Sequence, residues 1–208
     1  MNDETVNAEE DHAVSELAKI LSKGGVAAIP TETCYGLAAD ATNMNAVAKI
    51  YVLKGRHFSK PISVFVSDSK TAGKYFSLSE KERLLMKKFM PGPLSLVASK
   101  RKNSKLAPNL SKGSRIAFRV SSHPFVQKLV LKFGKPITAT SANISGKKEN
   151  YSAAGIARIF SGKIEAIVDY GKLKKNPPST VAEVKNNKIS ILRKGKISEK
   201  DLQRIISP

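Results

Sequence analysis

The sequence predicts an α/β fold (α+β mixed), in which a twisted, mostly mixed sheet is flanked by helices. The chain has 208 residues, of which 41% are hydrophobic and 25% charged, so it can bury a sizeable core. Segments with a helical spacing of apolar residues are interspersed with short apolar runs that end at glycine or proline. These elements do not follow the strict strand–helix alternation of a doubly wound parallel sheet, so we expect parallel and antiparallel strands together.

Apolar residues recur at helical spacing in several segments. In the first, Val14, Leu17 and Leu21 share one face. Ser79, followed three residues later by Glu82, forms a capping box that marks the start of another helix. We expect helices at 12–23, 44–53, 79–90, 124–133 and 152–161, and a short terminal helix that begins with Ser198 and Asp201.

Short apolar runs predict the strands. The run Val26–Ile29 has no polar residue and stops at Pro30, which is typical of a buried strand. The segment 100–114 is polar and basic and predicts an exposed loop. We expect residues 1–10 to be a disordered acidic terminus and residues 11–208 to form a single domain. The expected strands are 26–29, 62–66, 94–99, 115–120, 136–140, 164–168, 180–184 and 188–192.

Positive charge dominates most of the chain. The sequence contains 36 lysine and arginine residues against 17 aspartate and glutamate residues, a net charge of +19 at pH 7. Six of the acidic residues precede the first basic residue, Lys19, so residues 17–208 carry a net charge of +25. Such a field favours polyanions: nucleic acid, nucleotides or phosphates. The plainer alternative is a lysine-rich surface that is simply solvated.

Several classes of protein are excluded by composition. No apolar run approaches the roughly 20 residues that span a bilayer, and the acidic N-terminus lacks the apolar stretch of a secretory signal. The single cysteine, Cys34, cannot form an internal disulfide, and three histidines are too few for a Cys/His zinc cage. We therefore expect a cytoplasmic protein that has no membrane segment and that contributes no metal site of its own.

Three polar segments are candidates for a binding site, although no familiar phosphate loop or hydrolase motif is present. The turn 30–36 (PTETCYG) follows a buried strand, a place where ligands bind in α/β sheets. Lys54, Arg56 and Lys60 place three cations within seven residues at the end of a helix. The segment 138–146 (TATSANISG) follows a strand and offers small hydroxyl and amide side chains.

Each segment also has a purely structural explanation. The hydroxyls of the turn can satisfy its own backbone groups. Lys54 and Arg56 can stabilise the C-terminal end of the preceding helix through its dipole. Ser141 and Asn143 can cap a helix. Taken singly these explanations are favoured, and only the order of all the segments along the chain indicates a function.

That order resembles the YrdC-like threonylcarbamoyl-AMP synthase family, in its short, single-domain form. The resemblance covers roughly residues 15–206 and implies a YrdC-like fold with a basic concave cleft. The motifs that carry it are PTETCYGL at 30–37, KGRHFSKP at 54–61, RIAFRV at 115–120, TSANISG at 140–146, PPSTV at 177–181 and ILRKG at 191–195.

The resemblance implies an enzyme, a nucleotidyltransferase that converts ATP, L-threonine and bicarbonate into threonylcarbamoyl-AMP and pyrophosphate. Mg2+ would accompany ATP, and a downstream tRNA threonylcarbamoyl transferase would complete the modification of tRNA. Direct RNA binding is an additional expectation. Because the nucleophile, the triphosphate and the leaving group are all anions, such a site needs fixed cations more than a strong general base.

The family pattern assigns roles to individual residues. The implied catalytic residues are Lys54 and Arg56, which clamp phosphates. The residues implied to bind ATP are Lys54, Arg56, Lys60, Arg115, Asn143, Tyr151 and Arg193. The residues implied to bind threonine are Thr33, Phe65, Arg119, Ser141 and Ser179. Lys60 stands where asparagine is common and Phe65 where histidine is common, and both departures bear on substrate affinity.

Two other functions compete with this one. An RNA- or tRNA-binding module without catalysis fits the charge, but it leaves the Lys54/Arg56 and Ser141/Asn143 sets without a purpose. Its aromatic content of 6%, without tryptophan, also serves base stacking poorly. A carbamoyl-adenylate-forming paralogue shares the fold, but such domains belong to longer chains with acylphosphatase and zinc-finger segments.

Overall fold

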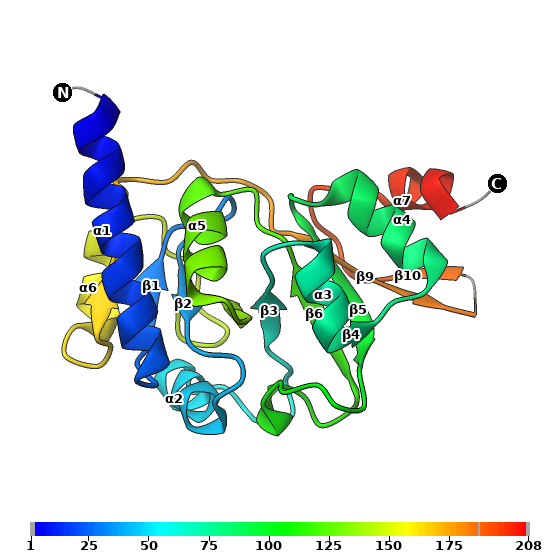
Figure 1. The fold of residues 1–208 in the computed structure, drawn as a ribbon, viewed down its shortest axis with the longest axis horizontal. Coiled ribbons are helices and arrows are strands. Elements are labelled where there is room, and N and C mark those ends of the chain that lie inside the picture. The colour runs from blue at the N-terminus through cyan, green and yellow to red at the C-terminus, as the bar shows by residue number, and fades with distance from the viewer. Residues whose placement is uncertain (1–2, 187, 207–208) are drawn as a thin grey trace.

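The computed structural model describes residues 3–186 and 188–206, whose strands form one sheet flanked by helices (Figure 1). The sheet has ten strands in the order β10-β9-β5-β6-β3-β7-β2-β1-β8, and β4 pairs with β5 beside this path. The strands are β1 (Ala27–Ile29), β2 (Gly36–Ala38), β3 (Ser63–Phe65), β4 (Phe76–Ser77), β5 (Leu94–Lys100), β6 (Arg115–Arg119), β7 (Ile137–Ser141), β8 (Ala166–Ile167), β9 (Thr180–Lys185) and β10 (Lys188–Arg193).

The helices cover both faces of this sheet. They are α1 (Asp3–Ser22), α2 (Met44–Lys54), α3 (Ser69–Tyr75), α4 (Glu80–Phe89), the 3-10 turn η1 (Pro108–Leu110), α5 (Pro124–Phe133), α6 (Ala153–Phe160) and α7 (Glu199–Ile206). Across the residues the structure describes, no helix combines the length and the apolar character needed to cross a membrane.

The sheet is mixed, which confirms the predicted fold class. The pairs β1–β8, β3–β6 and β5–β9 are parallel. The pairs β1–β2, β2–β7, β3–β7, β5–β6 and β9–β10 are antiparallel. The central strands β6, β3 and β7 therefore come from distant parts of the chain, and the residues at their ends are brought together only by folding.

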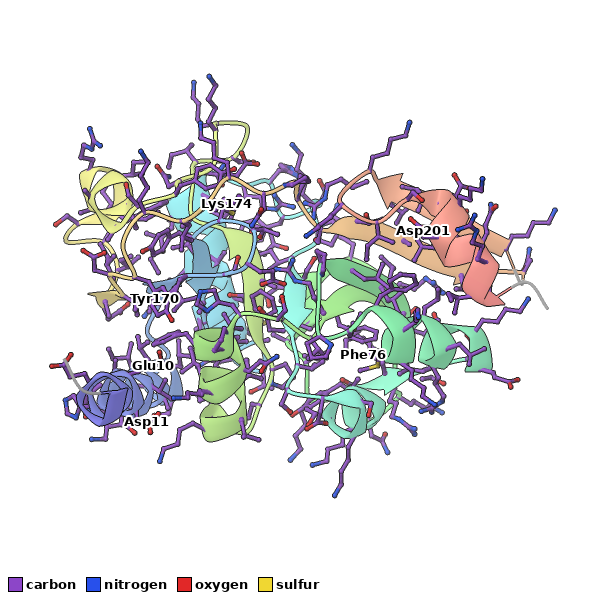
Figure 2. The ribbon with its side chains drawn as sticks, turned by 90° about the horizontal axis from the view of Figure 1, so that it is seen from above. Glu10, Asp11, Phe76, Tyr170, Lys174 and Asp201 are labelled. Carbon is purple, nitrogen blue, oxygen red and sulfur yellow. The ribbon has the colours of Figure 1, made fainter. Side chains whose placement is uncertain are left out.

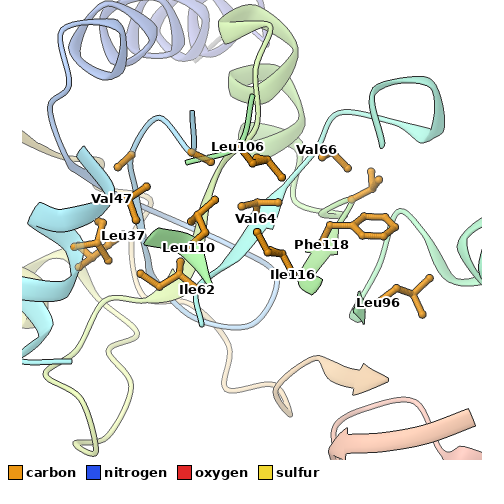
Figure 3. Packing of buried hydrophobic residues seen from close by; sticks show 14 of the residues in the cluster. Leu37, Val47, Ile62, Val64, Val66, Leu96, Leu106, Leu110, Ile116 and Phe118 are labelled. Atoms are coloured by element: carbon orange, nitrogen blue, oxygen red, sulfur yellow. The ribbon is translucent and has the colours of Figure 1, made fainter. Parts of the chain in front are cut away.

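The sheet separates two hydrophobic cores, and alternation along the strands decides which core each side chain enters. On β1, Ala27 and Ile29 face the core beneath α1 and α5, whereas Ala28 faces the larger core on the other side. On β3, Phe65 and Val64 divide in the same way. This two-sided burial explains why Val26–Ile29 is uniformly apolar. Figure 3 shows the larger core, with Val64 among its labelled members.

Helix α1 begins at Asp3, within the segment 1–10 for which the sequence predicts disorder, and earlier than the predicted helix 12–23. Its early turns are held to α5 by charge: Lys128 Nζ lies 3.1 Å from Glu10 Oε1 and 2.9 Å from Asp11 Oδ1. Figure 2, seen from above, places Glu10 and Asp11 beside α5. The sequence alone indicates a solvated acidic tail, because Lys128, the partner of Glu10 and Asp11, lies more than a hundred positions away.

The helix-capping predictions are confirmed. Ser79 Oγ accepts a hydrogen bond from the backbone N–H of Glu82, and the Glu82 carboxylate accepts one from the Ser79 N–H, which completes the capping box of α4. Ser198 Oγ accepts a hydrogen bond of 3.2 Å from the Asp201 N–H at the start of α7. Both caps are local in sequence, so they could be identified without knowledge of the fold.

Several short elements were missed, and each is fixed by partners remote in sequence. The prediction assigned the segment 30–36 to a turn, but β2 begins at its final glycine and pairs with β1 and β7. Strand β4 has only two residues and exists through its pairing with β5. Helix α3 did have a local signal, since Asp68 caps it by accepting a 2.6 Å hydrogen bond from the Thr71 N–H.

The prediction that segment 100–114 is an exposed loop is wrong for its centre. Leu106, Ala107 and Leu110 are buried and belong to the larger core, where Figure 3 shows Leu106 and Leu110 among the sheet residues. Backbone hydrogen bonds hold the segment there: the Ala107 N–H donates to the Ala41 carbonyl and the Ile62 N–H to the Leu110 carbonyl. The lysines on either side hid this apolar turn in the sequence.

Two hydrogen bonds of the Thr180 side chain form a clip that joins the segment after β10 to the start of β9. Thr180 Oγ1 donates to the Ile197 carbonyl at 2.7 Å and accepts from the Ile197 N–H at 2.9 Å. A Cβ atom added to Gly195 would lie 2.3 Å from the Thr180 nitrogen and 2.4 Å from the Pro178 carbonyl oxygen. The close approach requires glycine, and it fixes the backbone that presents Ser179.

We predict that Gly195→Ala lowers the free energy of unfolding by about 1–3 kcal/mol, the usual cost of overpacking against atoms that cannot move away. Gly113→Ala is the matched control, because a Cβ there meets no heavy atom within 4 Å, and it should change stability by less than about 0.5 kcal/mol. Urea denaturation of both variants measures the difference. Equal stabilities for the two variants would show that the close approach at Gly195 does not require glycine.

Candidate active site

A central cavity lies over the middle strands of the sheet and has a volume of about 210 Å³. This is below the roughly 300–1,000 Å³ of pockets that enclose drug-sized ligands, so it suits a small polar molecule or one end of a larger one. Its lining comes from β2, β3, β5, β6, β7 and β10, from the β1–β2 turn, from the α2–β3 and β7–α6 loops, and from the connection before β9. Three arginines and one glutamate are among the lining residues: Arg56, Arg119, Arg193 and Glu149.

The structure brings most of the predicted site residues to this one cavity. Eight of the twelve line it: Thr33, Arg56, Phe65, Arg119, Ser141, Tyr151, Ser179 and Arg193. Four are absent from its lining: Lys54, Lys60, Arg115 and Asn143. Residues from sequence positions 33 to 193 thus meet at one place, as the order of the motifs predicted.

Three residues of the β1–β2 turn, Thr31, Thr33 and Cys34, line the cavity, and the Thr31 hydroxyl also holds the turn together. Thr31 Oγ1 donates to the Cys34 carbonyl at 2.6 Å and accepts from the backbone N–H groups of Thr33 and Cys34. The structural explanation therefore holds for Thr31, whose hydroxyl satisfies the turn. Thr33 and Cys34 both line the cavity, and burial raises the pKa of the Cys34 thiol, which keeps it neutral.

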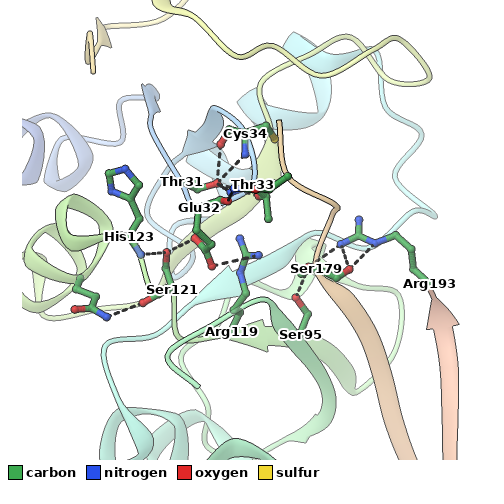
Figure 4. A network of polar contacts seen from close by, with 12 residues as sticks. Thr31, Glu32, Thr33, Cys34, Ser95, Arg119, Ser121, His123, Ser179 and Arg193 are labelled. Carbon is green, nitrogen blue, oxygen red and sulfur yellow. Dashed lines mark hydrogen bonds and ion pairs between the residues drawn. The ribbon is translucent and has the colours of Figure 1, made fainter. Parts of the chain in front are cut away.

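Arg119, the last residue of β6, is a buried cation at the inner end of the cavity. Its guanidinium carbon lies 4.8 Å from the centroid of the Phe65 ring. Nη1 lies 3.5 Å from Glu32 Oε1, as Figure 4 shows. Its Nε is buried and, among the described residues, has no hydrogen-bond partner. Burial lowers the pKa of Arg119, and Glu32 acts against that shift. A buried, incompletely bonded guanidinium is a ready site for an anionic oxygen.

A second arginine orders two hydroxyl groups of the cavity wall. Arg193 donates from Nε and Nη2 to the Ser179 carbonyl, and from Nη2 to Ser179 Oγ at 2.8 Å. Ser179 Oγ in turn lies 3.0 Å from Ser95 Oγ (Figure 4). Because a guanidinium only donates, Ser179 Oγ must accept from it, and its own hydrogen is free for Ser95 or for a ligand. The pair therefore presents a donor to an anionic or hydroxyl ligand.

Arg56 is held by backbone carbonyls rather than by a carboxylate. Nε donates to the Lys60 carbonyl at 3.2 Å and Nη2 to the Pro61 carbonyl at 2.9 Å. Burial lowers the pKa of Arg56, although the group stays a cation. The side chain of Lys60 is exposed and lies outside the cavity lining, so in this structure Lys60 contributes its backbone to the position of Arg56.

Lys54 and Asn143 form a support behind the cavity. Lys54 is 1% exposed, and Nζ donates to the Ser141 carbonyl, to the Asn143 carbonyl at 2.9 Å and to Asn143 Oδ1 at 3.0 Å. Asn143 Oδ1 also accepts from Ser141 Oγ at 2.6 Å. These contacts replace the helix cap considered for Ser141 and Asn143. The expected phosphate clamp is therefore buried, and it joins the end of α2 to the loop after β7.

The same burial lowers the pKa of Lys54 to about 8, with Arg56 contributing a smaller repulsion. The ammonium group is thus held in its charged form by three oxygen acceptors and opposed by desolvation. Through its hydrogen bond to the Ser141 carbonyl, the ammonium group holds Ser141 in place, and Ser141 lines the cavity.

Arg115 was expected near ATP but lies at the far end of β6 from Arg119. Four residues apart on one strand, the two side chains point to the same side but start roughly 13 Å apart. Arg115 Nη2 donates to the Val97 carbonyl at 2.8 Å and lies 3.5 Å from Glu183 Oε2. It lines a separate depression with Ser79 and Ser99. The motif RIAFRV contains both arginines, and the sequence could not tell which end of the strand faces the cavity.

Several residues of the site were not predicted. Ser95 and Glu149 line the cavity, and Asn176 Nδ2 donates to the Glu32 carbonyl at 2.9 Å. Glu32 lies inside the motif PTETCYGL and was available as a signal, whereas Ser95 sits in an ordinary apolar strand. Within the described residues no three His, Cys, Asp or Glu side chains are grouped closely enough to hold a metal ion.

We predict that Lys54→Met lowers the free energy of unfolding by about 2–4 kcal/mol, because it leaves buried carbonyl groups without donors. Lys60→Met is the matched control, since it makes the same chemical change on an exposed lysine six residues away and should cost less than about 0.5 kcal/mol. Chemical denaturation at neutral pH distinguishes the two. A stable Lys54→Met protein would show that the ammonium group is not a structural support.

A protein-family model and several known proteins match this chain over most of its length. The Sua5/YciO/YrdC family model, described as telomere recombination, matches residues 19–195. A threonylcarbamoyl-AMP synthase of Bacillus subtilis is 36% identical over 200 residues, which cover 95% of this chain and 58% of that protein. A protein of Methanocaldococcus jannaschii is 34% identical over 200 residues, with 96% of this chain and 94% of that protein covered.

Solved structures show the same fold. Pyrococcus abyssi Sua5, solved in complex with L-threonine, is 33% identical with a TM-score of 0.88 over 94% of this chain and 58% of that one. Escherichia coli YciO has a TM-score of 0.84 at 22% identity, over 92% of this chain and 93% of that one, a likeness of fold alone. The chain spans somewhat more than half the length of the Bacillus and Pyrococcus relatives and nearly all of the Methanocaldococcus protein. On the family match and these identities, the chain belongs to the Sua5/YciO/YrdC family.

Proposed function

We propose that this chain is a threonylcarbamoyl-AMP synthase, an enzyme of the nucleotidyltransferase class. It joins L-threonine, bicarbonate and ATP into threonylcarbamoyl-AMP and releases pyrophosphate. The observation that carries the proposal is a single cavity whose lining includes the buried Arg119 and two more exposed arginines, Arg56 and Arg193. The name of the Bacillus relative and the threonine complex of the Pyrococcus relative support it.

The inner end of the cavity suits an amino acid. Arg119 offers a guanidinium with an unused Nε donor, which matches the carboxylate of threonine. The hydroxyls of Thr33, Ser141 and Ser179 line the same space and can bond the amine or hydroxyl of the ligand. Phe65 closes one side as an apolar surface beneath Arg119, so the departure from histidine replaces a polar contact with a cation–π contact.

The other end suits the phosphates of ATP. Arg56 and Arg193 are bonded to uncharged groups, so both retain their full charge for an anionic ligand. Tyr151 lines the cavity and supplies an aromatic side chain for the nucleoside. Mg2+ enters as part of the ATP substrate. Phosphate oxygens, water and at most Glu149 would complete its coordination, since Mg2+ is satisfied with one or two protein carboxylates.

The chemistry requires positioned charge. The threonine amine and bicarbonate form a carbamate with loss of water, and a carbamate oxygen attacks the α-phosphorus of ATP. The bond to pyrophosphate breaks, and its electrons leave with the pyrophosphate. Arg56 and Arg193 offset the repulsion between the carbamate and the phosphates, while Lys54, through Ser141, holds the wall against which the carbamate forms.

The remaining parts of the proposal concern the setting of the reaction. The product is an activated carbamate that a separate tRNA threonylcarbamoyl transferase would consume in tRNA modification, in the cytoplasm. The charge of +25 on residues 17–208 supports direct contact with RNA as a secondary property.

The first test is pyrophosphate release. With ATP, Mg2+, bicarbonate and L-threonine, we expect the protein to release pyrophosphate only when both bicarbonate and threonine are present, because the nucleophile is their joint product. A coupled pyrophosphatase assay with each substrate omitted in turn measures this. Release that is indifferent to threonine would refute the proposal and favour another adenylate-forming reaction.

The second test separates the two ends of the cavity. Arg119→Gln should weaken threonine binding by about 10–100-fold and ATP binding by less than twofold, because a charge-assisted bond to the carboxylate contributes about 1.5–3 kcal/mol. Arg56→Gln should show the opposite preference, since its partners in the protein are backbone carbonyls. Calorimetric titration of both variants with each ligand decides. Equal losses of threonine and ATP affinity in both variants would refute the assignment of the two ligands to different ends of the cavity.

A further inference from the structure

Glu32 is anchored by three residues from two segments beside the cavity, the end of β6 and the connection before β9. Its Oε1 lies 3.5 Å from Arg119 Nη1, and its Oε2 accepts a 2.6 Å hydrogen bond from Ser121 Oγ (Figure 4). Its backbone carbonyl accepts from Asn176 Nδ2 at 2.9 Å. The Ser121 hydroxyl is itself committed, because Ser121 Oγ accepts from the His123 N–H and so directs its hydrogen at Glu32. Oε2 is therefore fixed in direction, whereas Oε1 is buried and, among the described residues, has the 3.5 Å contact with Arg119 but no hydrogen-bond partner.

This fixed carboxylate determines how Arg119 is presented. The guanidinium is confined between the Phe65 ring and Glu32, with Nη1 toward the carboxylate. The side chains of Arg119 and Glu32 are 7% and 14% exposed, so solvent screens their attraction little. With Nη1 beside the carboxylate and the Phe65 ring against the guanidinium, Nε remains a buried donor that has no hydrogen-bond partner among the described residues and can serve a ligand.

The same contact sets the charge at each end of the cavity. Arg119 and Glu32 together are neutral, whereas Arg56 and Arg193 are bonded to uncharged oxygens. A polyphosphate gains from two arginines whose hydrogen-bond partners are uncharged, with Glu149 as the acidic member of the lining, and it is repelled by Glu32. An amino acid, whose own charges cancel, is attracted by oriented donors and loses little from a neutral surrounding.

We infer that Glu32 is a positioning and selectivity residue: it aims Arg119 at the amino-acid carboxylate and keeps polyphosphate out of the amino-acid end. Glu32 acts through Arg119, since it lies beside the cavity and not in its lining. The inference rests on the proposed function and adds to it a reason why two anionic substrates occupy one cavity without exchanging places. The alternative is an ion pair that only stabilises the fold.

The experiment uses Glu32→Gln, which removes the charge and keeps the shape, and inorganic pyrophosphate as the polyanionic probe. In the wild-type protein, pyrophosphate and L-threonine should bind without displacing one another in calorimetric titrations. In Glu32→Gln, pyrophosphate should displace threonine, because the amino-acid end now carries a net positive charge. Pyrophosphate and threonine that remain independent in this variant overturn the inference.

Glu32→Ala tests the positioning role, because it removes the anchor as well as the charge. Threonine affinity should fall about tenfold, the equivalent of one charge-assisted hydrogen bond, and ATP affinity should stay within about twofold. A purely structural pair would instead lower the melting temperature and weaken both ligands alike, which overturns the inference. Glu16→Gln, on the exposed face of α1, is the control for removing one negative charge.

A fallback variant and the wild-type control cover the cases in which the Glu32 variants do not fold or threonine does not bind. If the Glu32 variants do not fold, Ser121→Ala frees the carboxylate from its hydrogen bond with the charge retained. Threonine affinity should then fall while ATP affinity holds, and equal losses overturn the inference. If the wild-type protein does not bind threonine at all, the proposed function itself fails. Threonine binding by the wild type together with wild-type behaviour of Glu32→Gln overturns only the role of Glu32.

Discussion

The arrangement of the cavity depends on one buried ammonium group. Lys54 ends α2, and its Nζ reaches two backbone carbonyls and one side-chain oxygen of the loop after β7. Its own carbonyl accepts a hydrogen bond of 2.8 Å from the Ser145 N–H, so the two segments are joined in both directions. Because a buried charge without acceptors is costly, the loop cannot move away from Lys54 without a large loss of free energy. Ser141 takes its position from this junction.

The arginines around the cavity are held by different kinds of partner, and the difference follows from their burial. Arg119 is nearly inaccessible to solvent and has a carboxylate beside it. Arg56 is half-buried and Arg193 is exposed, and the oxygens that they contact are uncharged. Water can compensate a partly exposed guanidinium, whereas a deeply buried one needs a charged neighbour. The depth of each arginine in the fold therefore decides the charge that it presents to a ligand.

The sequence was sufficient for the fold class and for most of the cavity, and its failures have identifiable causes. Capping boxes and apolar runs are local signals, so α4, α7 and the buried strand before Pro30 were predicted correctly. Burial is not local: nothing near Lys54 in the sequence reveals the loop that encloses it. Arg115 and Arg119 have the same strand parity, and only the pairing of β6 with β3 and β5 tells which one is near the cavity. Ser95 was missed because its importance comes from Ser179, 84 residues later.

The composition of the lining also fits the kind of chemistry proposed. Histidine is not among the lining residues of the described cavity, whose acidic member is Glu149. For a reaction that must deprotonate a neutral nucleophile at the transferring phosphorus, such a lining would be deficient. A carbamate oxygen is already anionic when it attacks, so the phosphoryl step has no proton to remove. What that step does require is that several negative charges approach one another, and fixed arginines lower this barrier without reorganising during the reaction. The absence of a strong base from the lining and the surplus of guanidinium groups are thus two aspects of one requirement.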